Sequence, residues 1–398
     1  MRRKLIATVL ILGLLALAGC GGTSGRPAAG SGSGNEPIKI GFVGGLTGPL
    51  AEYTTEAKQA LDWKVDEINQ KGGVLGRPIK MIYSDTKIDP QSARQAVERM
   101  VTSDKVVAII GDYFSPNTAA FLPLLDQYQV PAVSPNSNAT NITTSGSKYI
   151  FRVVHSSLLE AETLAHYAVE KKGNQTFVIL GGSDGFSKAN GDAFANALKT
   201  MGKGRLLGYD TYDRGTTKDF TNLLLKYKDQ NPDAIFLAGG LADGALIAKQ
   251  ARDLGIKAQL YGSNAQARPG FFQIAGPAAV GTILINDYPG DATGADKYAE
   301  PGTKAFIKEF QAHFNKVPNY DDAHAVDSLM LIVQSIEAAK STKGSDLREQ
   351  LLKVKDWQGA VGNRRILPNG DSRATIYMIQ IQPDGKWTVI DSVKDDGK

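Results

Sequence analysis

Residues 38–73 read IKIGFVGGLTGPLAEYTTEAKQALDWKVDEINQKGG. The segment opens with a short apolar run at 38–44 and continues into a stretch whose apolar residues recur at helical spacing. The residues that share one helical face are Ala57, Ala60, Leu61, Val65 and Ile68. The Lys-Gly-Gly sequence at 71–73 ends the helix. This segment therefore predicts a buried strand followed by an amphipathic helix.

The same order of apolar run and amphipathic stretch recurs along the chain. The pairs are IKMIYSD with PQSARQAVERMVTS (79–103), VVAIIGD with PNTAAFLPLLDQY (106–128), TFVILGG with KANGDAFANALKTM (176–201) and AIFLAGG with GALIAKQARDLG (234–255). Strict alternation of strand and helix implies parallel sheets joined by right-handed crossovers. The predicted fold class is α/β with doubly wound parallel sheets.

The C-terminal part departs from this order. A long helix is predicted near 321–340, and TIYMIQIQ (375–382) and WTVIDS (387–392) follow it with Pro383-Asp384-Gly385 between them. Two apolar runs separated by such turn residues predict a β-hairpin.

The N-terminus has the layout of a signal peptide. Three basic residues at 2–4 precede an apolar stretch at 5–18 that is shorter than the ~18 to 20 residues of a membrane-spanning helix. The net charge of the whole chain is +4, and loss of those three basic residues leaves about +1, which does not indicate nucleic-acid binding. The remaining residues, from 38 onward, are enough for two domains.

Leu17-Ala18-Gly19-Cys20 resembles the bacterial lipobox, in which the cysteine is acylated and becomes the new N-terminus. Cys20 is the single cysteine of the chain, so it has no partner for an internal disulfide. Residues 21–37 are nearly all Gly, Ser, Ala and Pro and are predicted to be a flexible tether with a reach of roughly 22 Å. We expect 1–19 to be a signal peptide and 20–37 to be a lipidated cysteine with its tether.

Over 38–394 the chain resembles the leucine/isoleucine/valine-binding family of periplasmic binding proteins, the type I receptors of ABC importers. The matching stretches are 38–93, 106–120 (VVAIIGDYFSPNTAA), 130–143 (VPAVSPNSNATNIT) and 215–240. The resemblance implies two doubly wound lobes joined by a three-segment hinge near Val153, Ile285 and Arg364. The implied boundaries are 38–153 plus 286–363 for lobe one and 154–285 plus 364–394 for lobe two.

The resemblance also implies a ligand site in the loops that follow the strands of both lobes. From lobe one it assigns Tyr53, Tyr113, Ser115 and the loop residues Asn136, Ser137 and Asn138. Ser115 and this loop correspond to family positions that bind a ligand carboxylate, and a helix N-terminus after Ser115 favours an anion. The alternative is that Ser115 only caps that helix.

From lobe two the resemblance assigns Phe186 and Asn264. Phe186 corresponds to an aromatic residue that covers the ligand. Asn264 stands where amino-acid binders of the family commonly have a glutamate for the ligand ammonium, a charge that an amide cannot supply. Asp112, Asp184 or Asp243 are candidate substitutes, and the alternative is a ligand without an amine, an aromatic or aliphatic carboxylate.

The implied function is capture of a branched-chain or related amino acid by hinge closure, for an ABC permease. No cofactor, metal, enzymatic activity or nucleic-acid partner is implied, and we expect a monomer held outside the cytoplasm by its lipid. A ligand-sensing receptor subunit is an alternative role for the same fold. A serine hydrolase is a further alternative, because Gly181-Gly182-Ser183-Asp184-Gly185 fits G-x-S-x-G after a predicted strand.

The lipobox generates a test of its own. We expect metabolic labelling with palmitate to label the protein and the label to disappear in Cys20→Ser, because the substitution removes the only thiol in the chain. Label that persists in Cys20→Ser would refute acylation at this residue.

Overall fold

The computed structural model describes residues 36–48, 51–290 and 292–394. The predicted signal peptide, Cys20 and the tether up to residue 35 lie outside the described residues. Within the described ranges, no helix combines the length and the apolar character needed to cross a membrane.

The first sheet has five strands in the order β2-β1-β3-β4-β5, and every neighbouring pair is parallel. The strands are β1 (Ile38–Gly44), β2 (Ile79–Asp85), β3 (Ala108–Ile110), β4 (Ala132–Ser134) and β5 (Ile150–Arg152). Alternate residues of β3 face opposite sides, so Ala108 and Ile110 join one apolar core and Ile109 joins another. The sheet is therefore covered on both faces, as in a doubly wound fold.

Helices from two distant parts of the chain cover this sheet. They are α1 (Ala51–Gln70), α2 (Pro90–Arg99), α3 (Ser115–Tyr128), α4 (Asn141–Thr144), α12 (Tyr320–Ala339) and α13 (Gly344–Leu351). Helix α1 buries Ala57, Ala60, Leu61 and Val65, which confirms the predicted face. Helix α12 packs against α1, β3 and β4, so residues from the C-terminal third of the chain complete the core of the N-terminal sheet.

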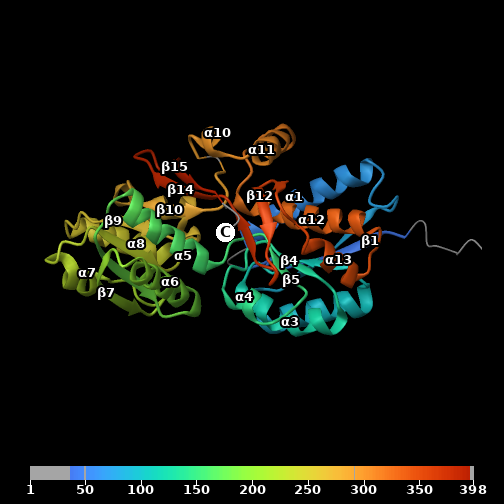
Figure 1. The fold of residues 1–398 in the computed structure, drawn as a ribbon, viewed down its shortest axis with the longest axis horizontal. Coiled ribbons are helices and arrows are strands. Elements are labelled where there is room, and N and C mark those ends of the chain that lie inside the picture. The colour runs from blue at the N-terminus through green and yellow to red at the C-terminus, as the bar shows by residue number, and fades with distance from the viewer. Residues whose placement is uncertain (1–35, 49–50, 291, 395–398) are drawn as a thin grey trace, which may run out of the picture. The chain divides into compact units, whose positions relative to one another are not determined.

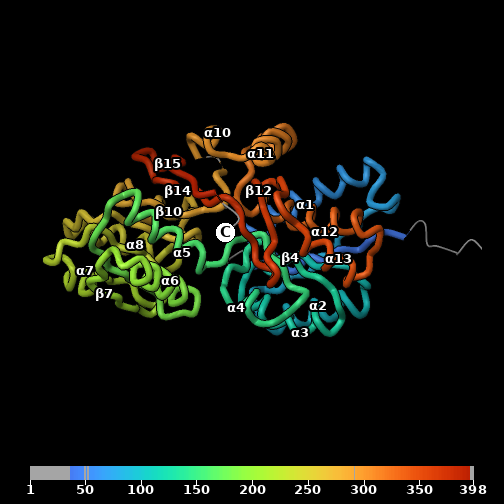
Figure 2. Tube along the Cα trace, viewed as in Figure 1, coloured from blue at the N-terminus to red at the C-terminus, as the bar shows by residue number. Residues whose placement is uncertain are grey.

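The second sheet has seven strands in the order β15-β14-β10-β9-β8-β6-β7. The strands are β6 (Thr176–Gly182), β7 (Arg205–Tyr212), β8 (Ala234–Ala238), β9 (Gln259–Gly262), β10 (Ile283–Asn286), β14 (Ile376–Ile381) and β15 (Trp387–Val393). Strands β6 to β10 are parallel, whereas β14 pairs antiparallel with both β10 and β15. The predicted C-terminal hairpin is thus confirmed, and Figure 2 shows it in red beside β10.

The parallel strands of the second sheet alternate with α5 (Ser157–His166), α6 (Gly185–Met201), α7 (Thr221–Lys228), α8 (Leu241–Asp253) and α9 (Pro269–Ala275). In β6, Val178 and Leu180 enter one core while Phe177 and Ile179 enter the other. Short helical segments at Met100–Asp104, Tyr167–Lys171, Asn264–Gln266 and Gly276–Ala279 extend or join these elements. Both faces of this sheet are covered as well.

The remaining elements lie along the connections between the sheets (Figure 1). They are α10 (Ala295–Tyr298), α11 (Pro301–Phe314) and a small antiparallel sheet of β11 (Trp357–Gly359), β12 (Gly362–Ile366) and β13 (Ser372–Ala374). The chain passes from one large sheet to the other after β5, returns after β10, and passes again between β13 and β14. Arg364 lies in β12, and the chain joins the seven-stranded sheet at Ile376.

A buried polar cluster joins these three connections. Asp287 follows β10, and its Oδ2 lies 3.2 Å from His155 Nδ1 and 3.1 Å from His324 Nε2. His155 follows β5, and its Nε2 accepts a hydrogen bond from the backbone N–H of Ala374 at 2.9 Å. Burial acts to raise the pKa of Asp287, but the two histidines outweigh it and hold that pKa well below its ordinary value.

Glu160 in α5 is buried near this cluster without a matching partner. Its side chain is 1% exposed, and neither carboxyl oxygen has a hydrogen-bond partner among the described residues. Burial raises the pKa of Glu160 well above its ordinary value, and the negative charge of Asp287 adds to the effect against a smaller opposing contribution from Arg152. The raised pKa favours the protonated form of Glu160 in the folded protein.

Glu160→Gln should make the protein more stable at neutral pH. The folded state holds a proton that the unfolded state releases above about pH 4.5, so wild-type stability falls as the pH rises from there toward the raised pKa. The neutral amide has no such proton. We expect a gain of about 1 kcal/mol or more near neutral pH and none in acid, measured by urea unfolding across the pH range.

The control is Glu162→Gln, two residues along the same helix, where the side chain is half-buried. It should leave the pH dependence as in the wild type. Equal pH slopes for Glu160→Gln and the wild type would contradict the buried, protonated state of Glu160.

Candidate functional site

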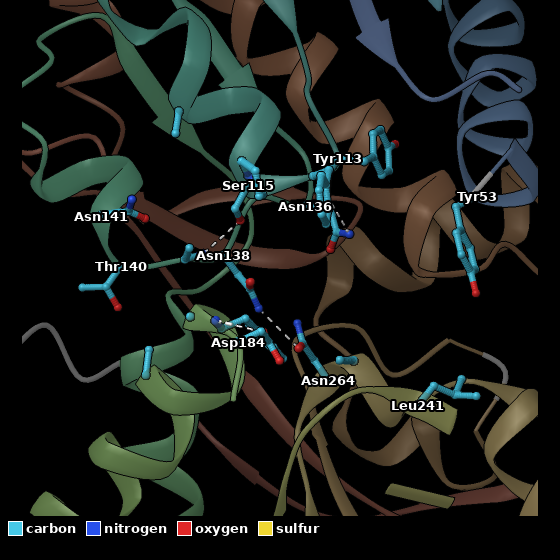
Figure 3. Close-up of a pocket in the computed structure, with 18 of the residues that line it drawn as sticks. Tyr53, Tyr113, Ser115, Asn136, Asn138, Thr140, Asn141, Asp184, Leu241 and Asn264 are labelled. Atoms are coloured by element: carbon cyan, nitrogen blue, oxygen red, sulfur yellow. Dashed lines mark hydrogen bonds between the residues drawn. The ribbon is translucent and has the colours of Figure 1, made fainter. Parts of the chain in front are cut away.

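A cavity of about 940 Å³ opens between the carboxyl ends of the two parallel sheets. Its walls come from the segments that follow β1, β3 and β4 of the first sheet and β6, β7, β8 and β9 of the second. In Figure 3, Ser115, Asn136 and Asn138 face Asp184, Asn264 and Leu241 across this space. The site is thus built from both halves of the fold, as expected for the carboxyl ends of parallel strands.

Ser115 is the first residue of α3, and no side chain caps this helix end. The residue at the N-cap position is Phe114. Ser115 therefore does not cap this helix, which was the alternative to carboxylate binding in the sequence analysis. Its hydroxyl instead accepts a hydrogen bond from the backbone N–H of Ala139 at 3.3 Å. The α3 N-terminus and the loop after β4 are thereby tied together on one wall of the pocket.

The loop after β4 carries the three residues that the resemblance singled out. Asn136 and Asn138 line the pocket. Ser137 does not, because its side chain is fully buried and its hydroxyl donates to the carbonyl oxygen of Asp112 at 2.9 Å. Ser137 therefore lies behind the wall that its two neighbours form.

Arg152 stabilises the loop after β4. It is fully buried in β5, and its Nη1 donates to the carbonyl oxygens of Ser137 at 3.2 Å and Ala139 at 2.9 Å. Its Nε pairs with Asp371 at 2.7 Å. A buried guanidinium with a charged partner and several acceptors is well satisfied, so it fixes the backbone that presents Asn138.

Asn264 forms part of the opposite wall, directly after β9. Its side chain is 8% exposed, and its Oδ1 accepts a hydrogen bond from Asn138 Nδ2 at 3.4 Å. This long contact links the two walls across the pocket (Figure 3). Both partners are neutral amides.

Aromatic side chains supply much of the apolar lining. Tyr53, Tyr113 and Phe186, the three aromatic residues assigned from the resemblance, all line the cavity, together with Phe114 and Tyr320. Tyr113 is buried, and its hydroxyl donates to the carbonyl oxygen of Asp321 at 3.4 Å. Of the eight assigned residues, seven lie at the cavity and Ser137 lies behind it.

Asp184 is the carboxylate that lines the cavity, and it is fully engaged. It caps α6 by accepting from the backbone N–H groups of Phe186 and Ser187, and it accepts from the Ser187 hydroxyl at 2.6 Å. Arg214 Nη1 donates to it at 3.2 Å. Partial burial acts to raise its pKa, but the hydrogen bonds and the charge of Arg214 outweigh burial and lower it.

Asp112 and Asp243, the other two candidates for binding an ammonium, lie outside the lining. Asp112 is buried and accepts from Thr86, Asn117 and the backbone of Phe114; burial raises its pKa to about 6. Asp243 accepts from Tyr212 at 2.5 Å and from the backbone of Gly240. Neither carboxylate faces the ligand space.

An ion pair crosses the cleft at one end of the cavity. Arg268 Nη1, in the segment after β9, lies 2.8 Å from Asp321 Oδ2 in α12, which packs on the first sheet. Asp321 is fully buried, whereas 21% of the Arg268 side chain is exposed. The guanidinium also lies over the ring of Tyr53 at 4.3 Å and that of Tyr320 at 5.6 Å.

Comparison with known proteins places the chain among binding proteins. A family model described as periplasmic binding protein matches residues 37–386. The Leu/Ile/Val-binding protein BraC3 of Rhizobium johnstonii is 27% identical over 339 residues, covering 81% of this chain and 92% of that protein. The Leu/Ile/Val-binding protein of Escherichia coli K12 is 27% identical over 316 residues, covering 74% and 85%.

A solved structure shows the same similarity. The branched-chain amino acid transporter substrate binding protein LivJ of Streptococcus pneumoniae, crystallised in complex with isoleucine, matches with a TM-score of 0.78 and 26% identity, covering 90% of this chain and 100% of that one. The family model spans nearly every described element, from β1 to the turn before β15. The chain belongs to the periplasmic binding protein family.

This periplasmic binding protein has the fold that the sequence resemblance implied, a type I arrangement of two doubly wound sheets. Its relatives are named as binding proteins and not as enzymes. The site gives no role to the G-x-S-x-G match: Ser183 is exposed outside the cavity lining, and its hydroxyl donates to Asp213 at 3.3 Å. Of the two later histidines, His324 is fully buried against Asp287.

Sequence reasoning missed Arg268, Arg214 and Tyr320 as lining residues. Arg268 and Arg214 each follow a parallel strand of the second sheet, so their position after an apolar run could have identified them as lining residues. Tyr320 opens α12, far from any strand end, and only the packing of α12 on the first sheet brings it to the cavity.

Loss of one partner of the Arg268–Asp321 pair should destabilise the protein. In Asp321→Asn the guanidinium loses its compensating charge, and we expect the free energy of unfolding to fall by about 2 kcal/mol, less than for a fully buried pair. A double-mutant cycle with Arg268→Gln, measured by urea unfolding, should give a coupling energy of about 1–2 kcal/mol.

The matched control is the exposed pair Lys188–Asp192, at 2.9 Å on one face of α6. Its cycle should give about 0.5 kcal/mol or less. A coupling energy for Arg268–Asp321 no larger than that of the control would contradict a structural role for the pair.

Proposed function

We propose that this protein is the extracytoplasmic solute-binding component of an ABC importer, held at the membrane surface by acylated Cys20. It captures a small carboxylate with an apolar body between its two lobes and delivers it to a permease that supplies the energy. It acts as a monomer, without catalysis and without a cofactor.

The observation that carries this proposal is the cavity between the carboxyl ends of the two sheets. Its walls belong to both halves of the fold, and both contribute polar groups as well as aromatic rings. A ligand in this position contacts both walls at once, so its binding favours the conformation in which the halves are close together. The names of the relatives point the same way, since they bind branched-chain amino acids.

The carboxylate of the ligand binds at the N-terminus of α3. This helix end has no side-chain cap, and its positive dipole end faces the cavity beside the Ser115 hydroxyl. Asn136 and Asn138 add amide donors on the same wall. Phe186 and Leu241 close on the apolar body from the opposite wall.

Closure takes place about the three connections between the sheets, with lobe one formed by 38–153 and 286–363 and lobe two by 154–285 and 364–394. The cluster of His155, Asp287 and His324 lies at these connections and remains intact during the motion. The Arg268–Asp321 ion pair and the Asn138–Asn264 hydrogen bond cross the cleft, so they join the two lobes in the closed arrangement.

Binding and its site are tested together by calorimetry and thermal shift with a panel of amino acids, aromatic acids and short aliphatic acids. We expect at least one carboxylate to raise the melting temperature, and Ser115→Ala and Phe186→Ala each to weaken its binding by about tenfold or more. Ser115 contributes a hydroxyl at the helix end and Phe186 contributes apolar contact area.

The matched control is Ser183→Ala, a second serine after a strand, outside the cavity lining. It should bind the ligand as the wild type does. Unchanged affinity in both Ser115→Ala and Phe186→Ala would show that the ligand binds elsewhere, and ester turnover abolished by Ser183→Ala would replace the binding-protein assignment with a hydrolase.

A further inference from the structure

The charges around the cavity restrict the chemistry of the ligand more closely than the fold does. Three formally charged side chains line the described part of the cavity: Asp184, Arg214 and Arg268. An ammonium group enclosed there would need a carboxylate oxygen to compensate its charge. Among the described lining residues, Asp184 is the one side chain that carries such oxygens.

Asp184 already accepts four hydrogen bonds and pairs with Arg214. Its Oδ1 accepts from Phe186 N, Ser187 N and Arg214 Nη1, and its Oδ2 accepts from the Ser187 hydroxyl. An incoming ammonium would have to share this carboxylate with the Arg214 guanidinium, which already compensates its charge. The one acid among the described lining residues is therefore already paired with a cation.

Each of the three acids behind the lining has at least one partner, although Asp321 Oδ1 has none among the described residues. Asp321 pairs with Arg268, Asp243 accepts from Tyr212 and the Gly240 N–H, and Asp112 accepts from Thr86 and Asn117. The two guanidiniums reach the surface of the cavity, while Asp321, Asp243 and Asp112 do not. The described lining thus presents guanidinium N–H donors and no unpaired carboxylate.

Asn264 occupies the place on the second wall that faces the Ser115 side. A ligand whose carboxylate lies at the α3 N-terminus has Asn264 on the opposite wall, and Asn264 contacts Asn138. These amides offer neutral oxygens at most. A hydrogen or a neutral group on the α-carbon fits this environment, whereas an ammonium would lose its hydration without gaining a counter-charge.

We propose that the ligand of this protein is a carboxylate that lacks an ammonium group and carries an aromatic or aliphatic body. This inference rests on the proposed function and specifies its ligand. The rings of Tyr53, Phe114 and Phe186, with the Leu241 side chain, surround the space that the body occupies. Asn264 is the residue that sets the preference against amines.

The test compares ligands that differ only in the amine: 3-phenylpropionate with L-phenylalanine, and 4-methylpentanoate with L-leucine. Calorimetry on the purified protein should show binding of the amine-free member of at least one pair about tenfold or more tighter than its amino acid. Equal or tighter binding of the amino acid would overturn the inference and leave the proposed function intact. A second outcome would also overturn the inference: no member of either pair binds, and another carboxylate of the panel binds only in the form that carries an amine.

The role of Asn264 is tested by Asn264→Asp, which adds a negative charge at nearly constant size. We expect the ratio of affinities to shift toward the amino acid by about tenfold or more, because the new carboxylate pairs with the ammonium and repels the amine-free acid. Asn264→Gln keeps the neutral amide and should keep the wild-type preference. An unchanged ratio in Asn264→Asp would overturn the assignment of this residue.

The two proposals fail in different ways. If no carboxylate of any kind stabilises the protein, the proposed function falls and the inference falls with it. If carboxylates bind but amines are accepted as readily as their amine-free partners, only the inference falls.

Discussion

A buried carboxylate, Asp287, is bound by two histidines at the place where the three connections between the sheets meet. His155 comes from the first connection and contacts Ala374 in the third, while Asp287 opens the second. His324 approaches from α12, and its Nδ1 donates to the carbonyl oxygen of Tyr320 at 2.8 Å. Because a buried charge is tolerated only where it is paired and hydrogen-bonded, this cluster holds the three connections in one arrangement.

The position of the cavity follows from that arrangement. Once the connections are fixed, the carboxyl ends of both parallel sheets face a common space, and the segments after the strands become its walls. Two contacts then orient the residues of the lining. Arg152 holds the backbone around Asn138, and the hydroxyl of Ser115 ties α3 to the same loop. Across the cleft the two walls are joined by the Arg268–Asp321 ion pair and the Asn138–Asn264 hydrogen bond.

Charge is distributed unevenly across this site. The acids near the cavity are bound to backbone N–H groups, hydroxyls or arginines, as Asp184 and Asp321 show. The arginines keep part of their surface toward the ligand space. The carboxylates described near the cavity thus stabilise the fold, while guanidinium groups remain at the surface of the cavity.

Local periodicity in the sequence predicted the elements of the fold, because side-chain spacing along one helix or strand depends only on neighbours in the chain. The run at 38–44, the buried face of α1 and the C-terminal hairpin all follow from such spacing. The resemblance further indicated which loops reach the cavity. It did not separate Asn136, which lines the cavity, from Ser137, which lies behind it, since the direction of successive side chains in a loop depends on its packing.

Tertiary structure alone decided the long-range pairs. Arg268 and Asp321 are 53 residues apart, and His155 and Asp287 come from different connections, so no local pattern relates them. The antiparallel addition of β14 to β10 and the arrival of Tyr320 at the cavity likewise depend on how α12 and the hairpin pack on sheets formed earlier in the chain. Periodicity determines which face of an element is buried, whereas the partner of a buried charge is determined only when distant segments are brought into contact.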